Sequence, residues 1–343
     1  MTTNASKDTP VISAKNVWKI FGNNPEKYLK EMPAGRSFDD IRADGYIAGV
    51  KDVSIEVGRG EMLVIMGLSG SGKSTLVRCF SRLHDITGGT ISVEGQDIMS
   101  LPEKDLIELR RSKMGMVFQS FGLLPHRTVL DNIAFPLEMR GQDRHARRER
   151  ALEVIKLVGL DGREDYFPRE LSGGQQQRVG IARSLAIEPD IWFLDEPFSA
   201  LDPLIRREMQ DEFLRLQGML GKTIVFITHD FDEALRLADR IAIMKDGAVE
   251  QIDTPDQIVL NPATEYVRKF TEEIDKARVV HARVLADAGA SADGTPVDGA
   301  ASVHDLAKLL ITDTREAFPV TENGQSLGAM QKAKALDVLL GQR

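Results

Sequence analysis

Short runs of apolar residues, bounded by polar or glycine-rich segments, recur along the first two thirds of the chain. Such runs are typical of strands that are buried on both faces of a sheet. We expect them at residues 62–66, 114–118, 191–194 and 223–228. The longer segments between them predict helices, at residues 73–83, 101–112, 176–186, 203–218 and 232–238. Strands that alternate with helices in this way indicate an α/β fold.

Near the N-terminus, two apolar segments flank a polar insertion. Residues 11–21 and 49–57 predict strands, because their apolar positions alternate. The insertion between them, residues 23–46, contains proline and glycine and is expected to hold one short helix. Residues 87–95 predict a hairpin whose turn lies at the glycine pair 88–89.

Three further segments carry a clear pattern. Residues 128–160 have helical character with a break near Gly141. Residues 240–252 predict two strands joined by an Asp-Gly dipeptide, which is a strong hairpin signal. Residues 255–270 predict a helical region that closes this part of the chain.

The C-terminal segment has a different composition. Residues 286–301 are rich in Ala, Gly, Ser and Asp, which is typical of a flexible linker. After it, residues 303–311 and 336–340 predict helices, and residues 317–320 and 327–330 predict short strands. This unit is small for an independent hydrophobic core, so we expect it to need a partner surface.

Directly after the strand at 62–66 the chain reads GLSGSGKST, which matches the phosphate-binding pattern G-x-x-x-x-G-K-[ST]. The glycines let backbone N–H groups point at an anion, and the following helix adds the positive end of its dipole. Lys73 supplies a charge for the phosphates and Ser74 a hydroxyl for Mg²⁺. The alternative is a glycine-rich turn without a ligand. The candidate nucleotide-binding residues here are Gly67, Ser69, Gly70, Ser71, Gly72, Lys73, Ser74 and Thr75.

Polar residues follow three of the other predicted strands. Gln119 ends the strand at 114–118, Asp195 and Glu196 end the strand at 191–194, and His229 ends the strand at 223–228. Since ligands bind at the carboxyl ends of strands in open α/β sheets, these side chains are placed to reach the nucleotide. Asp195 can hold Mg²⁺, Glu196 can orient or deprotonate water, and an imidazole can donate to the γ-phosphate. Each residue alone would be an ordinary surface residue.

A second candidate anion site lies at residues 171–175, LSGGQ, before a helix expected to begin at Gln176. If it belongs to a separate helical subdomain, this site cannot serve the same phosphates as the first. It is then placed to serve those of another subunit.

The bulk composition limits the function further. The net charge is −8, which argues against a general nucleic-acid-binding surface. The single cysteine, Cys79, excludes an internal disulfide and fits a reducing cytosol; we interpret it as a small core residue rather than a redox site. No signal-peptide pattern and no apolar run of membrane-spanning length is found in the sequence. A membrane role would therefore act through partner proteins.

Taken in order, these motifs resemble an ABC transporter ATPase subunit. The stretches that carry the resemblance are GLSGSGKST, FQSFGLLPH, LSGGQ, IWFLDEP, SALD and ITHD. The resemblance implies a P-loop NTPase core with an antiparallel β subdomain and a helical subdomain at about residues 120–185. It assigns residues 1–275 to the ATPase domain and residues 276–343 to a truncated, CBS-like unit after the flexible linker.

The resemblance also implies a role for each matched position. Two subunits would bind two ATP molecules head to tail with Mg²⁺, with Asp195 and Gln119 at the metal and Glu196 as catalytic base. Gln119 and His229 would sense the γ-phosphate, and Asp202 would transmit the state across the interface. The γ-phosphate of the other subunit's ATP would contact the signature residues Ser172, Gly173, Gly174 and Gln175. Phe21 is the candidate platform for adenine, with ordinary core packing as the alternative.

Among such ATPases the chain is most similar to import subunits for glycine betaine, proline and choline. This type implies integral membrane subunits that contact about residues 120–132, a substrate-binding protein in the same system, and a peripheral place at the cytoplasmic face of the membrane. An importer for another small solute, such as an amino acid, is one alternative. A soluble ABC ATPase that acts on ribosomes or DNA is a second alternative.

The C-terminal segment departs from the family pattern. Residues 318–320 and 327–329 match a CBS pattern weakly, but residues 331–334 read QKAK where CBS units carry T-x-x-D, a step that helps hold adenosine. A packing or dimer-contact role is therefore the alternative to nucleotide sensing.

Overall fold

The computed structural model describes residues 9–118 and 122–341. By their contacts, the residues divide into two compact units, Met1–Glu233 with Met244–Val249 and Ala234–Ile243 with Glu250–Arg343. Each unit is described by itself. The first unit carries the segments predicted to bind nucleotide. The predicted domain boundary at residue 275 does not coincide with this division and stays a prediction.

A parallel sheet forms the centre of the first unit. Its strands β3, β8, β7 and β6 lie side by side in that order. The bounds are β3 Met62–Met66, β6 Met114–Val117, β7 Ile191–Asp195 and β8 Thr223–Thr228. Every residue of β3, β7 and β8 is buried, as expected for continuous apolar runs in a parallel sheet. The four strands predicted from apolar runs are thereby confirmed.

Aromatic side chains fill the core beside this sheet. Trp192 and Phe226, from neighbouring strands, both pack against Phe213 of helix α8, with ring centroids 5.4 and 5.9 Å apart. The helices that connect the strands are α3 Lys73–Phe80, α4 Glu103–Lys113, α8 Pro203–Leu220 and α9 Phe231–Leu237. Cys79 lies in α3, fully buried, and burial raises the pKa of its thiol to about 12. Its interpretation as a core residue is confirmed.

A second, antiparallel sheet has the strand order β2, β1, β4, β5. Its bounds are β1 Ile12–Phe21, β2 Ile47–Val57, β4 Gly88–Val93 and β5 Gln96–Asp97. The turn predicted at Gly88 and Gly89 is wrong, because these residues begin β4 and the turn lies at Glu94 and Gly95. Gly89 is needed for close packing instead, since a Cβ there would lie 2.3 Å from the carbonyl oxygen of Asn16 in β1.

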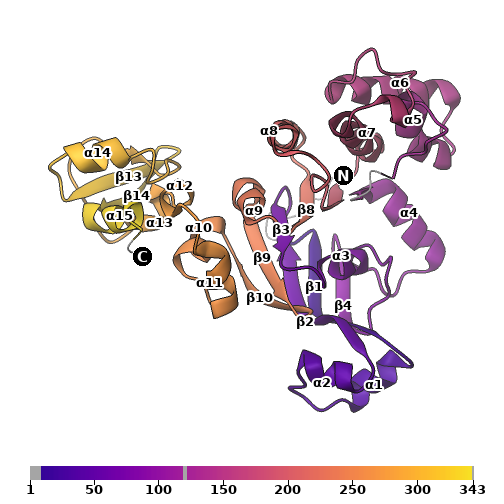
Figure 1. Cartoon of the computed structure of the whole chain (residues 1–343), viewed down its shortest axis with the longest axis horizontal. Helices are drawn as coiled ribbons and strands as arrows, with labels where there is room; N and C mark the ends of the chain where they lie inside the picture. The colour runs from indigo at the N-terminus through magenta and orange to yellow at the C-terminus, as the bar shows by residue number, and fades with distance from the viewer. Residues whose placement is uncertain (1–8, 119–121, 342–343) are drawn as a thin grey trace, which may run out of the picture. The chain divides into compact units, whose positions relative to one another are not determined.

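The polar insertion between β1 and β2 holds two helices instead of the one expected, α1 Pro25–Glu31 and α2 Phe38–Ala43. Figure 1 shows both at the end of this sheet. Helix α2 begins with a capping box, in which Ser37 and Asp40 bond to each other's backbone N–H. The sequence signals of short helices are weak because so few residues contribute to them.

Three helices form a separate group in Figure 1: α5 Val129–Met139, α6 Arg144–Leu157 and α7 Gly173–Leu185. The break near Gly141 is confirmed, and Gly141 has a φ of 72° between α5 and α6. Helix α7 begins three residues earlier than predicted, because Ser172 and Gln175 form a capping box at its start. The signature glycines are therefore its first turn.

The second unit contains a sheet with the strand order β11, β14, β13, β12. Its strands are β11 Ala286–Asp287, β12 Val297–Asp298, β13 Ala317–Glu322 and β14 Gln325–Gln331. Its helices are α10 Pro255–Leu260, α11 Glu265–Thr271, α12 Lys276–Val279, α13 Ala282–Leu285, α14 Ala307–Thr312 and α15 Lys332–Leu339. Strands β9 Arg240–Lys245 and β10 Ala248–Asp253 run across the division between the units.

The segment at residues 286–301, expected to be a flexible linker, contributes both outer strands of this sheet. β11 pairs with β14, and β12 pairs with β13. The N–H of Gly299 also donates to the carbonyl of Thr321 at 2.8 Å. These bonds use the backbone alone, so a composition of small residues does not reveal them.

Among the described residues, no helix is long and apolar enough to cross a membrane. This agrees with the absence of such a run from the sequence.

Candidate functional site

The largest group of predicted site residues lines one cavity of about 700 Å³ in the first unit. Glu196 and His229 lie on this cavity together with Phe21. From the phosphate-binding loop, the cavity is lined by Ser69, Gly70, Gly72, Lys73, Ser74 and Thr75. Residues that are far apart in the sequence thus meet at the carboxyl ends of β3, β7 and β8.

The loop between β3 and α3 has two positions that only glycine can occupy. Gly67 has a φ of 145°, and a Cβ there would lie 2.2 Å from the carbonyl oxygen of Met244. Gly72 has a φ of 100°, and a Cβ there would lie 2.1 Å from the carbonyl oxygen of Gly49. The Oγ of Ser71 is buried without a hydrogen-bond partner. A tight loop with a spare polar group before a helix N-terminus fits a polyphosphate.

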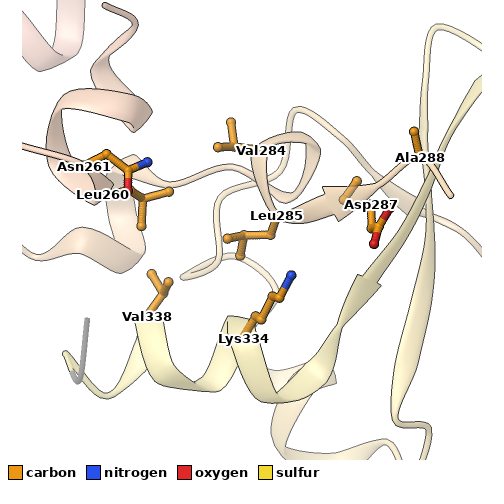
Figure 2. Close-up of a pocket in the computed structure, with 9 residues that line it drawn as sticks. Leu260, Asn261, Val284, Leu285, Asp287, Ala288, Lys334 and Val338 are labelled. Carbon is orange, nitrogen blue, oxygen red and sulfur yellow. The ribbon is translucent and has the colours of Figure 1, made fainter. Parts of the chain in front are cut away.

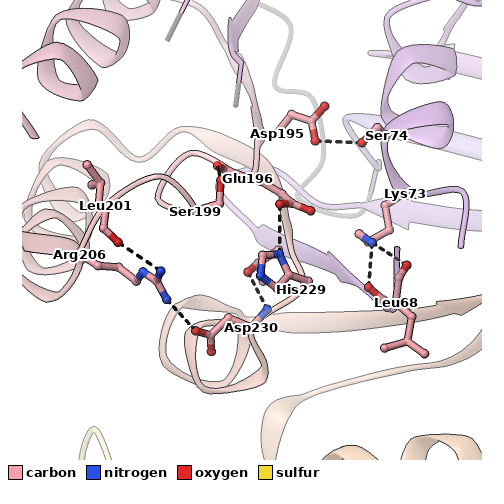
Figure 3. A network of polar contacts seen from close by, with 12 residues as sticks. Leu68, Lys73, Ser74, Asp195, Glu196, Ser199, Leu201, Arg206, His229 and Asp230 are labelled. Atoms are coloured by element: carbon pink, nitrogen blue, oxygen red, sulfur yellow. Dashed lines mark hydrogen bonds and ion pairs between the residues drawn. The ribbon is translucent and has the colours of Figure 1, made fainter. Parts of the chain in front are cut away.

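Lys73 is the first residue of α3 and is only 6% exposed. Its ammonium donates to the carbonyl oxygens of Gly67 at 2.7 Å and Leu68 at 3.0 Å, as Figure 3 shows in part. Burial lowers the pKa of Lys73, and the carboxylates of Glu196 and Asp195 act in the opposite direction. The loop therefore holds a desolvated positive charge at the cavity, which suits a phosphate.

Ser74 and Asp195 face each other at 3.0 Å, with the Ser74 hydroxyl donating to the Asp195 carboxylate (Figure 3). Asp195 is buried at the end of β7, and burial raises its pKa while the bond from Ser74 lowers it. A hydroxyl and a carboxylate are the hard oxygen donors that Mg²⁺ prefers. This pair fits a magnesium ion, which would neutralise charge on bound phosphates.

Glu196 turns its side chain toward His229. Its φ of 45° is rare for a residue other than glycine, asparagine or aspartate, and it ends the extended path of β7. Its Oε2 lies 3.1 Å from Nδ1 of His229, and its carbonyl oxygen accepts from the Ser199 hydroxyl at 2.9 Å. Backbone strain of this kind is concentrated at functional sites. The arrangement holds a carboxylate on the cavity, where it can accept a proton from water.

Sequence reasoning missed a polar network behind His229. Arg206 of α8 forms an ion pair with Asp230 at 3.2 Å and donates to the Leu201 carbonyl at 3.3 Å (Figure 3). The N–H of Asp230 donates to Thr228 at 3.0 Å. This network links the end of β8 to the start of α8. The position of Asp230 next to His229, at the same strand end, was the available sequence signal.

The signature residues lie elsewhere. Ser172 caps α7 by accepting from the N–H of Gln175 at 3.3 Å, and Gln175 accepts from the N–H of Ser172 at 3.0 Å. Within the described part of the chain, none of residues 172–175 lines the cavity. The side chains of Ser172 and Gln175 thus each accept from the other residue's backbone N–H, while Gly173, the first residue of α7, is exposed.

Asp202 lies close to this signature. It caps α8 by accepting from the N–H of Ile205 at 3.1 Å. A Cβ on Gly174 would lie 2.8 Å from Ile205, so the starts of α7 and α8 lie against each other. The signature and Asp202, about thirty residues apart in the sequence, thus lie close together in the structure. Both lie outside the residues that line the cavity.

Two predicted elements are described only partly or not at all. Gln119 lies outside the described residues, as does the first part of the proposed contact segment 120–132. In the described part of that segment, Asn132 is fully buried and its amide bonds to the backbone of Leu124, Arg127 and Thr128. Asn132 therefore shapes the loop before α5.

A second cavity, of about 620 Å³, lies in the second unit (Figure 2). Lys334 and Val338 line it from α15, and Leu285 and Asp287 line it from the opposite segment of the same unit. Lys334 belongs to the segment QKAK at residues 331–334. The lining combines apolar side chains with one ammonium and one carboxylate.

Comparison with known proteins adds the following. The family model described as "ABC transporter" matches residues 50–199. The trimethylamine N-oxide transport system ATP-binding protein TmoW of Ruegeria pomeroyi is 80% identical over 97% of this chain and 98% of its own length. The glycine betaine/proline betaine transport system ATP-binding protein ProV of Escherichia coli is 47% identical over 97% of this chain and 83% of its own length.

Among solved structures, the fold is similar to the ATP-binding cassette MJ0796 in a dimeric, post-hydrolysis state bound to ADP and Pi. That match has a TM-score of 0.60 and 35% identity, and covers 71% of this chain and 98% of MJ0796. The α/β core, the antiparallel sheet and the helical group described above are thus those of an ABC ATPase, which binds ATP with Mg²⁺ and hydrolyses it. The chain belongs to the ABC transporter family, as an ATP-binding subunit.

Proposed function

We propose that this chain is the ATP-hydrolysing subunit of an importer for a small methylated amine, with trimethylamine N-oxide as the first candidate solute. The observation that carries the proposal is the 80% identity, over nearly the full length of both chains, to a subunit of a trimethylamine N-oxide transport system. A second relative of the same description, from Pelagibacter ubique, is 59% identical over 95% of this chain.

The cavity supports a specific division of labour among its residues. Lys73 and the loop N–H groups hold the phosphates, and Ser74 with Asp195 holds the Mg²⁺ ion. Glu196 takes the proton from the attacking water, and His229, 3.1 Å from it, orients its carboxylate and donates toward the γ-phosphate. Gln119 is proposed to lie beside the metal and this water.

The signature residues act on the nucleotide of a second copy of the chain. Two observations support this proposal. Residues 172–175 are absent from the cavity among the described residues, and the N–H groups at the start of α7 stand at an exposed surface. The solved structure of MJ0796 is described as dimeric. ATP binding would close the two copies over both nucleotides, Asp202 would report the closed state, and hydrolysis would open them.

The remaining partners follow from the transport role. Integral membrane subunits would contact about residues 120–132, next to the helical group, and a substrate-binding protein would deliver the solute. The chain would then lie at the cytoplasmic face of the membrane as a peripheral subunit. The residues from 276 onward would form a truncated CBS-like unit with a packing or dimer-contact role.

Glycine betaine, choline and proline are the second group of candidate solutes. The ProV relative, an ATP-binding protein of a glycine betaine/proline betaine transport system, favours glycine betaine, at 47% identity. Trimethylamine N-oxide, glycine betaine and choline all carry a nitrogen with three methyl groups. Sequence motifs of the ATPase do not distinguish them, because the solute contacts other subunits.

The proposal is tested by uptake of labelled solutes in a strain that lacks this subunit and in the same strain with the gene restored. We expect restored uptake of trimethylamine N-oxide, with less or none of glycine betaine, choline and proline. Restored uptake of only glycine betaine or choline would replace the first candidate with the second. Unchanged uptake of every methylated amine would contradict the transport proposal.

A further inference from the structure

The two ends of the polar insertion between β1 and β2 meet beside the nucleotide cavity. Phe21, the last residue of β1, pairs directly with Ile47, the first residue of β2. The insertion at residues 22–46 is therefore a long hairpin connection whose two ends lie side by side. The side chains of the insertion can therefore lie near the end of the β1–β2 strand pair.

Internal contacts give the insertion a defined fold. The rings of Tyr28 and Tyr46 stack with centroids 3.9 Å apart. The Tyr28 hydroxyl donates to Asp44 at 2.7 Å, and Arg36 forms an ion pair with the same carboxylate. Ile41 of α2 is fully buried. The position of α2 is thus determined by packing and by hydrogen bonds at both of its ends.

The first residue of α2, Phe38, lines the nucleotide cavity together with Phe21 and Ile47. Phe38 is half-buried, Phe21 is 38% exposed, and Ile47 is 59% exposed. These three apolar side chains lie on the cavity together with the phosphate-binding loop, whose lining residues are polar or glycine apart from Leu68. An apolar and aromatic region next to a phosphate cradle fits a nucleobase.

Contacts with neighbouring residues determine the position of the Phe21 ring. A Cβ on Gly49 would lie 2.8 Å from its ring and 3.0 Å from Thr75, so the ring lies over bare backbone beside the loop helix. His84 packs edge-on against the same ring, with centroids 5.8 Å apart, and the Lys19 ammonium lies 4.9 Å from its centroid. His84 and Lys19 therefore cover part of the Phe21 ring. A base that contacts the rest of this ring can also contact a second aromatic side chain.

We propose that Phe38 is a base-contacting residue, so that the insertion supplies a wall of the purine site in addition to Phe21. This inference rests on the proposed assignment of the cavity to ATP. The ligand contacted by Phe38 is the purine ring, and Phe38 makes no contact with the phosphates. The insertion thereby contributes to nucleotide selectivity as well as to affinity.

The test compares three ligands on the full chain by calorimetric titration with Mg²⁺: ATP, CTP and inorganic tripolyphosphate. For Phe38→Ala we expect the dissociation constant for ATP to rise roughly 5- to 50-fold, the scale of one base–aromatic contact. The constant for CTP should rise less, since a pyrimidine offers a smaller ring to stack on. Tripolyphosphate should bind as to the wild type. Tyr166→Ala, which removes an exposed aromatic side chain outside the cavity, should change none of the three constants.

Phe38→Leu separates stacking from simple filling of space, and it carries the test if the alanine variant fails to fold. We expect Phe38→Leu to remain weaker than wild type for ATP. Full recovery of ATP affinity by leucine, or an equal loss for all three ligands in the alanine variant, would overturn the inference in favour of a packing role. A wild-type chain that binds none of the three ligands would overturn the cavity assignment itself.

Discussion

The chain contains two helix N-termini that are candidates for binding phosphate. They differ in burial, in nearby charge and in whether they line the nucleotide cavity. The first, at Gly72 and Lys73, opens onto a cavity with a buried ammonium and a buried carboxylate. The second, at Ser172, is exposed, and the side chains of Ser172 and Gln175 each accept from the other residue's backbone N–H. The first site is able to bind an anion within one chain. Among the described residues, no part of the second lines the nucleotide cavity, and we propose that its ligand is the nucleotide of a second copy.

The largest expected effect is on the first site. Lys73→Ala removes the buried ammonium, so ATP binding should weaken at least about tenfold and hydrolysis should fall at least about 100-fold. Binding is checked by titration with ATP and Mg²⁺, and hydrolysis by phosphate release. Lys156→Ala, an exposed lysine of α6, is the matched control and should behave as wild type. Normal turnover by the Lys73 variant would contradict the assignment of the loop.

The next effect separates binding from chemistry within the same site. Glu196→Gln keeps the hydrogen-bonding shape beside His229 but cannot accept a proton. We expect hydrolysis to fall about 100- to 10,000-fold while ATP affinity stays within about threefold. Molar-mass measurements should show that ATP and Mg²⁺ hold this variant as a dimer. A variant that binds ATP and remains monomeric would argue that ATP does not close two copies.

A variant of the helix N-terminus at Ser172 tests how this site differs from the one at Lys73. Gly174→Asp places a carboxylate at the start of α7, where it repels a phosphate and where its Cβ displaces the end of the Ile205 side chain, 2.8 Å away. We therefore expect ATP to bind to the variant chain as to wild type, while hydrolysis falls at least about tenfold. Gly218→Asp is the matched control, because it adds the same side chain to α8 where no atom lies within 4 Å. Equal hydrolysis by Gly174→Asp and wild type would remove the signature from the mechanism.

The smallest effect concerns stability and pH. Burial raises the pKa of Asp195 above its usual value, so its charged form costs free energy in the folded chain. The free energy of unfolding of the nucleotide-free chain should thus decrease as the pH rises through the folded pKa. Asp195→Asn removes this cost and should raise the melting temperature at pH 7, although hydrolysis is lost. A lower melting temperature would show that the bond to Ser74 outweighs the burial of charge.

Much of the first site could be predicted from the sequence. Glycines with a required backbone conformation, a lysine at a helix start and acids at a strand end are local signals, and Lys73, Ser74, Asp195 and Glu196 do meet in the structure. The capping pattern of Ser172 and Gln175 is also local, yet the start of α7 was predicted three residues late. The glycines were interpreted as a loop rather than as a first helical turn.

The parts that sequence reasoning missed depend on distant partners. Gly89 is required by the approach of Asn16, and the strands β11 and β12 exist only because β14 and β13 pair with them. Phe38 reaches the cavity because the insertion closes at Phe21 and Ile47. Such relations depend on register and loop closure, which the pattern of a single segment does not contain.

We propose that a working site combines the loop of one copy with the signature of another. The most direct measurement mixes two inactive chains, Lys73→Ala and Gly174→Asp, and follows phosphate release as their ratio is varied. A mixed dimer contains one intact site, made from the loop of the Gly174 variant and the signature of the Lys73 variant. We expect hydrolysis to reappear in the mixture and to be highest near equal amounts. Hydrolysis that stays at the level of the separate variants at every ratio would contradict it.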